Sequence, residues 1–87
     1  MNLSQRWIGV GLVLGLAALA PRLAGAQVEA AAVARIALLN NKAMDDYDSL
    51  EFDAAKKSLL EALSVARGAG ITGGKELVDT YLNLGVV

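Results

Sequence analysis

The chain has 87 residues, of which 8 are lysine or arginine and 9 are aspartate or glutamate, so its formal net charge is −1. This mildly acidic balance lacks the positive patch typical of nucleic-acid-binding proteins. Histidine and cysteine are both absent, which excludes imidazole bases, thiol nucleophiles, disulfides and the usual zinc sites. We therefore expect a protein that is not an enzyme and that uses no cofactor or metal.

The first 26 residues have the pattern of a secretory signal peptide. Arg6 lies near the amino terminus, and the 14 residues that follow it carry no charge. Ala24 and Ala26 then form the A-x-A pattern of a cleavage site. The sequence predicts cleavage between Ala26 and Gln27 and export of the chain to the periplasm or the extracellular space, with the periplasm favoured.

The alternative for this segment is an uncleaved membrane anchor. A helix needs about 20 apolar residues to span a bilayer, whereas Pro21 and Arg22 interrupt the apolar run before that length. Pro21 is also expected to break the apolar helix. Contact with a membrane is therefore expected only through an uncleaved signal peptide.

Apolar residues at helical spacing predict an all-α chain after residue 27, because no segment alternates with the period of a strand. A first helix is expected from about residue 28 to 49 and a second from about residue 53 to 67, with Asp53 as the N-cap of the second. The break between them is short, which predicts antiparallel neighbours. A third helix is expected to begin near Gly74 or Lys75.

The stretch "GAGITGGK", residues 68 to 75, has the glycine spacing of a dinucleotide-binding turn. Such a turn follows a strand and opens a helix, but a helix is expected before this stretch. The P-loop pattern also fails, since Ala69 stands in place of the first glycine and Glu76 in place of the magnesium-binding hydroxyl. We interpret the stretch as a loop with Gly68 or Gly70 in a left-handed cap, and we expect no nucleotide.

The acidic stretch "DDYDSLEFD", residues 45 to 53, partly matches the ligand pattern of a calcium-binding loop. Asp46 and Asp48 fit the first ligand positions of such a loop. Leu50, Glu51 and Lys57 stand where a ligand, a glycine and the closing glutamate are needed. We therefore expect a solvated turn and no metal site.

The stretch "YLNLG", residues 81 to 85, resembles the opening of a tetratricopeptide repeat, and "LEFDAAKKSLLEALSVA" resembles the second helix of the same motif. Two pairs of matched positions lie 42 residues apart, against a usual period of about 34. Lys42 and Asp46 depart from the pattern, and its closing proline is missing. The residues matched to packing positions are Leu39, Ala43, Ala55, Leu59, Ala62, Tyr81, Leu84 and Gly85.

The resemblance implies an α-solenoid of antiparallel helical hairpins over residues 36–87, after a signal peptide (1–26) and a helical extension (27–35). One repeat and the first helix of a second are present. Because at least about three repeats are needed for a continuous core, we expect either part of a longer repeat protein or a chain completed by self-association. An ordinary helical hairpin is the alternative.

Tetratricopeptide repeats bind proteins or peptides on a surface lined mainly by the first helix of each repeat. The resemblance therefore implies a non-catalytic scaffold or adaptor with a protein or peptide partner. The alternative function is a small secreted or membrane-tethered helical protein that acts by self-association, and the alternative for the face is an ordinary solvated surface. The candidate partner-binding residues are Ala37, Asn40, Met44, Tyr47 and Asp48.

Overall fold

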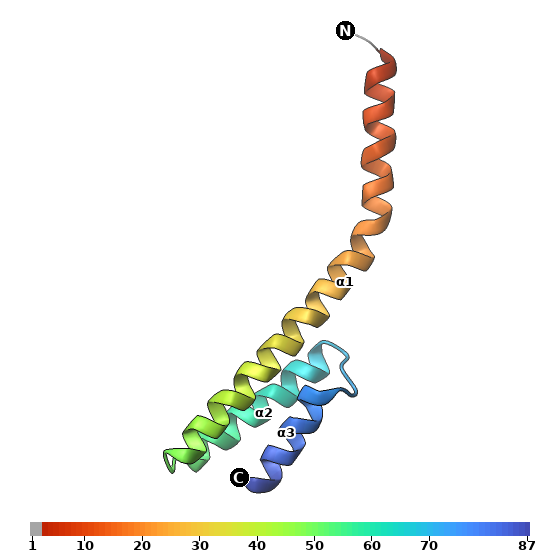
Figure 1. Ribbon diagram of the computed structural model, residues 1–87. Helices are drawn as coiled ribbons and strands as arrows, with labels where there is room; N and C mark the ends of the chain where they lie inside the picture. Colours follow the sequence, from red (N-terminus) through yellow and green to blue (C-terminus); the bar gives the residue numbers. More distant parts are fainter. Residues whose placement is uncertain (1–2) are drawn as a thin grey trace.

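A computed structural model describes the backbone of residues 3–87 and the side chains of residues 24–87. Its three helices are α1 (Leu3–Asp48), α2 (Phe52–Gly68) and α3 (Lys75–Val86). No strand occurs within residues 3–87, so the predicted all-α class is confirmed. The C-terminal half of α1 forms an antiparallel hairpin with α2, and α3 packs against both (Figure 1).

The predicted start of the first helix at residue 28 is wrong, because α1 continues back to Leu3 across Pro21. A proline inside a helix removes one hydrogen bond and can bend the helix without ending it. Figure 1 shows that α1 bends in its orange part. Most of the predicted signal peptide lies outside the residues whose side chains are described. Within the described side chains, no helix has the length and apolar character needed to cross a membrane.

The turn between α1 and α2 corrects the predicted N-cap. Glu51, and not Asp53, precedes α2, and its side chain makes no capping hydrogen bond. The carbonyl of Glu51 accepts a hydrogen bond from the N–H of Ala55 at 3.0 Å, so the helix begins before the expected residue. Leu50 adopts a φ of 64°, a left-handed conformation that lets the chain reverse at the end of α1.

The glycine-rich stretch forms the loop between α2 and α3, as predicted. Gly70 has a φ of 70°, and its N–H donates to the carbonyl of Arg67 at 3.2 Å. The N–H of Ile71 donates to the carbonyl of Ala66 at 2.8 Å. These two bonds around a left-handed glycine form a Schellman motif. The side chain of Ile71 packs against the core and fixes the direction in which the chain enters α3.

The core between α1 and α2 is made largely of small side chains. Ala43, Ala55 and Ala62 are fully buried, and Ile36 and Leu59 are the large apolar side chains buried with them. Small residues let the two helix backbones approach closely, and the larger side chains fill the spaces beside them. The buried residues form two clusters, one against the start of α3 and one against its end.

Leu59 and Leu60 provide a matched test of this core, since Leu59 is fully buried and Leu60 is half exposed. We expect Leu59→Ala to lower the free energy of unfolding by about 2–5 kcal/mol, because it removes apolar contact and leaves a cavity. Leu60→Ala is expected to cost less than about 1 kcal/mol. Urea denaturation followed by circular dichroism measures both values. Equal losses from the two variants would contradict the assigned core.

Candidate interaction surface

The structure divides the residues matched to repeat packing positions into two groups. Leu39 and Ala43 of α1 are buried against α2, and Ala55, Leu59 and Ala62 of α2 are buried with them. The remaining three lie on α3, where only one is in contact with the core. Leu84 is half-buried against the second cluster, whereas Tyr81 and Gly85 are exposed.

The predicted partner-binding face of α1 is partly covered by α3. The expectation that Asn40 is exposed is wrong, because α3 buries it to 6% exposure. Met44 and Tyr47 are half-buried against the second core cluster, and the rings of Tyr47 and Phe52 pack edge to face with their centroids 5.3 Å apart. Ala37 is half-buried and Asp48 is exposed. These residues therefore do not form one open surface.

Asn40 instead forms a buried hydrogen-bond network that joins α1 to α3. Its Nδ2 donates to Thr80 Oγ1 at 2.7 Å and to the carbonyl of Ile36 at 2.9 Å. Its Oδ1 accepts from Nδ2 of Asn83 at 2.9 Å. Thr80 Oγ1 donates in turn to the carbonyl of Glu76 at 2.8 Å. Because the buried polar atoms of this network are satisfied, it fixes the position of α3 along α1.

The sequence reading missed this network, although a signal for it was present. Asn40 lies four residues after Ile36, and Thr80 lies between Leu77 and Leu84 at spacings of three and four. A polar residue inside an apolar helical stripe indicates a buried hydrogen bond. The pairing partner lies about 40 positions away, so only the packing of α3 identifies it.

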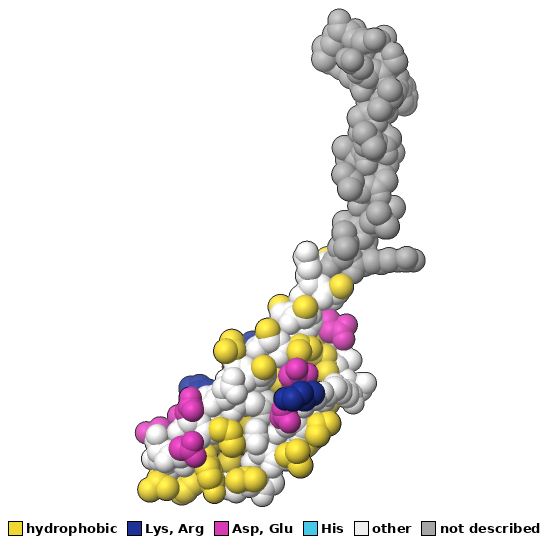
Figure 2. Space-filling model, in the orientation of Figure 1, with side chains coloured by type: hydrophobic (Ala, Val, Ile, Leu, Met, Phe, Trp, Pro, Cys, Tyr) yellow, Lys and Arg dark blue, Asp and Glu magenta, His cyan; other side chains and the backbone are white. Residues whose placement is uncertain are grey.

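The outer side of α3 carries an apolar stripe that no other part of the described chain covers. Its side chains are each more than half exposed, and in Figure 2 hydrophobic side chains gather along the part of the body where α3 lies. Gly85 lies within the stripe and is also exposed. The four exposed side chains are Val78 (53%), Tyr81 (60%), Leu82 (64%) and Val86 (58%).

Three stripe positions repeat a pattern that α1 uses in the core. In α1, Ile36, Leu39 and Ala43 are at most 8% exposed and pack against α2. The positions 42 residues later are Val78, Tyr81 and Gly85, and all three are exposed. Thus α3 presents the same order of large, large and small residues that α1 uses to hold α2, but no part of the chain from residue 24 to 87 covers it.

A groove between α2 and α3 borders this stripe. Leu63 and Arg67 from α2, Ile71 from the loop, and Leu77 and Tyr81 from α3 line it. Its walls expose polar and apolar surface in similar amounts, and Tyr81 belongs to both the groove and the stripe. The groove and the stripe together form one continuous surface, which we call the α2–α3 face.

The charges near the α2–α3 face are unevenly paired. Among the described side chains, the cations without an ion-pair partner are Lys56, Lys57 and Arg67, all on α2. Lys75, at the start of α3, donates a hydrogen bond to Asp79, which raises the pKa of the lysine above its ordinary value. Within the same residues, no three acidic side chains gather closely enough to hold a metal ion. The ion pairs present are Arg35–Glu61 at 2.6 Å, Lys42–Asp46 at 2.8 Å and Lys75–Asp79 at 2.7 Å.

Comparisons with protein-family models, with curated proteins and with solved structures found no match for this chain. The resemblance to tetratricopeptide repeats therefore depends on the residues matched in the sequence.

Asn40 and its neighbour Asn41 test the importance of the buried network, because Asn41 is exposed. We expect Asn40→Leu to lower the free energy of unfolding by about 1–3 kcal/mol, since Asn83 and Thr80 lose a buried partner. Asn41→Leu should change it by less than about 0.5 kcal/mol. Thermal and urea unfolding of both variants gives the comparison. A neutral Asn40→Leu would show that apolar contacts alone hold α3.

Proposed function

We propose that this chain is an exported, non-catalytic helical protein that binds another protein by packing against it, in the manner of a tetratricopeptide-repeat scaffold. The observation that carries the proposal is the exposed stripe of Val78, Tyr81 and Gly85, which repeats positions that α1 buries against α2. A surface that repeats a helix-binding pattern is suited to a further helix. Contiguous exposed apolar patches of this kind mark interaction sites on proteins.

The lack of a side chain at Gly85 adds a further reason. A Cβ built on Gly85 meets no atom within 4 Å, so no contact inside the described chain requires a glycine here. Glycine within a helix is less stable than alanine by roughly 0.5–1 kcal/mol. A partner helix could approach the backbone closely at this point only because Gly85 has no side chain. The glycine therefore supports close packing against another helix.

The proposed export also agrees with the distribution of buried residues. Every residue from 24 to 31 is exposed, and Ile36 is the first fully buried side chain of α1 from residue 24 onward. Among the described residues, cleavage between Ala26 and Gln27 would remove no core contact. The hairpin of α1 and α2 would keep its packing after removal of a signal peptide.

In the proposed repeat architecture, α1 and α2 form one repeat and α3 is the first helix of the next. Helix α3 packs against both preceding helices, as a solenoid requires of adjacent repeats. The alternative is a small secreted or membrane-tethered protein that self-associates through the same stripe. Both proposals use the same surface of α3. They differ in whether another protein or a second copy of the chain binds there.

Site-specific photo-crosslinking in cells tests the proposed contact. A benzophenone amino acid at Leu82 of the full chain is expected to yield discrete protein adducts on irradiation, because the side chain lies on the exposed stripe. The same group at Leu38 is the matched control, since Leu38 is a similarly exposed leucine on α1. Adducts are resolved by denaturing electrophoresis and identified by mass spectrometry. No adduct at Leu82, or the same adducts at both positions, would refute the contact.

The proposed export predicts a defined N-terminus. Intact-mass measurement of the protein purified from its own cells should give a chain that begins at Gln27. Replacing Ala24 and Ala26 with leucine should block cleavage, because the A-x-A site needs small side chains, whereas Ala31→Leu should leave it unchanged. Retention of residues 1–26 in the unaltered protein would instead indicate a tethered protein.

A further inference from the structure

We propose that the α2–α3 face binds an amphipathic helix of a protein partner that carries carboxylates along the edge next to α2. This inference deepens the proposed function, on which it rests, and names the chemistry of the partner. It is carried by two features that lie together: the open groove between α2 and α3, and two cations of α2 without an ion-pair partner among the described side chains, Lys56 and Arg67.

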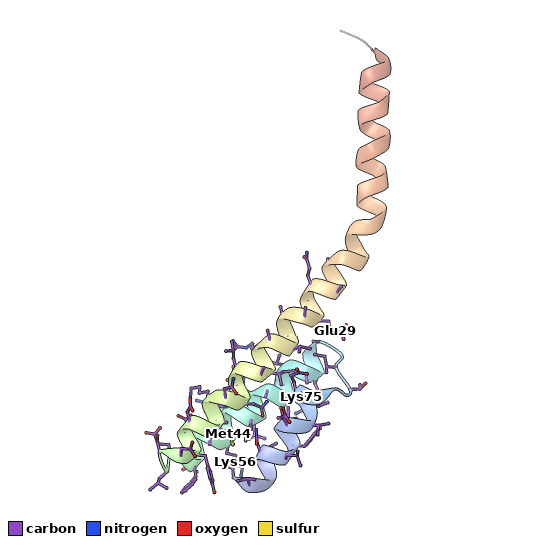
Figure 3. All side chains as sticks on the ribbon, viewed as in Figure 1. Glu29, Met44, Lys56 and Lys75 are labelled. Atoms are coloured by element: carbon purple, nitrogen blue, oxygen red, sulfur yellow. The ribbon has the colours of Figure 1, made fainter. Side chains whose placement is uncertain are left out.

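The two cations lie on one line along α2. Lys56, Leu60, Leu63 and Arg67 are separated by four, three and four residues, which places them on one side of the helix. Leu63 and Arg67 line the groove directly, so this side of α2 faces the groove. Figure 3 shows Lys56 near the end of α2 that lies beside the C-terminal end of α3. A cation therefore stands toward each end of the same apolar edge.

The occupant is expected to be a helix because of what α3 offers. Val78, Tyr81 and Gly85 repeat the positions through which α1 holds α2, and α2 meets those positions with small residues such as Ala55 and Ala62. A partner helix with alanines or glycines in its apolar face would meet α3 in the same way. Bound there, it lies beside α2 and places its flank next to Lys56 and Arg67.

Charge favours this partner over a second copy of the chain. In a symmetric dimer each subunit contributes the same patch to the interface. Packing of α3 on α3 would then bring Lys56 and Arg67 of both copies to one shared groove, and like charges facing each other disfavour association. A helix with glutamates or aspartates at its flank gains attraction at the same two positions.

The test uses the full chain and two synthetic helical peptides built on the α2 sequence, Phe52–Gly68. Both peptides keep the apolar face with its alanines, and their flanks carry either glutamates or lysines. Fluorescence anisotropy should show roughly fivefold to tenfold tighter binding of the glutamate peptide, a preference that shrinks as salt is raised. Absence of binding by the glutamate peptide, or equal binding of both, overturns the inference.

Charge-reversed variants show which lysine or arginine side chains cause the preference for the glutamate peptide. Lys56→Glu with Arg67→Glu should invert it, whereas Lys57→Glu should leave it unchanged, because Lys57 lies on the side of α2 that faces α1 with Leu39 and Lys42. Gly85→Ala should weaken the binding of both peptides at least several-fold, and it should leave the helical circular-dichroism signal of the chain intact. Inversion by Lys57→Glu, or unaltered binding by the Gly85 variant, overturns the inference.

Sedimentation separates failure of this inference from failure of the proposed function. If the full chain forms a dimer and Leu82→Asp abolishes it, the α2–α3 face binds a second copy. That result would overturn the inference of an acidic partner helix. Protein adducts at position 82 would then still support a protein-binding function. A monomer that binds the glutamate peptide supports the inference.

Discussion

The close approach of α1 and α2 is the contact on which the remaining structure depends. Ala43, Ala55 and Ala62 are fully buried in it, so the two backbones lie near each other and Leu59 fills the space between them. A contact made of alanines is well packed, but it removes only a small apolar area from water. The third helix adds apolar contact at both ends of the hairpin, through Leu77 and Leu84.

Helix α3 has two apolar sides that serve different purposes. The inner side contacts the hairpin and is fixed in register by the hydrogen bonds of Thr80 and Asn83 to Asn40. The outer side repeats the residue pattern of α1 and remains open. A polar network on the inner side suits this arrangement, since its hydrogen bonds have directional requirements that apolar contacts lack. The network therefore determines which side of α3 faces outward.

The sequence predicted the features that depend on local periodicity. Spacings of three and four residues identified the helices and the buried face of α2. The glycines of residues 68–75 predicted the loop with Gly68 or Gly70 in a left-handed cap, and Gly70 takes that conformation. The hydrogen-bond partner of Asn40 could not be predicted in this way, because it lies on a helix 40 residues further along the chain. Local periodicity also could not predict which side of α3 is exposed. Both sides carry apolar residues, and only the packing of α3 against the hairpin determines which one is buried.

The Asn40–Thr80 bond joins residues far apart in the chain, whereas contacts between α1 and α2 are closed by a short turn. Elements held by few, distant contacts open as separate cooperative units and lose hydrogen-exchange protection first. By this rule we expect α3 to open before the hairpin of α1 and α2 does. A ligand that binds only the docked form of α3 would raise the free energy of its opening by mass action. A partner bound to the outer side of α3 would thus stabilise the contacts on its inner side against local unfolding.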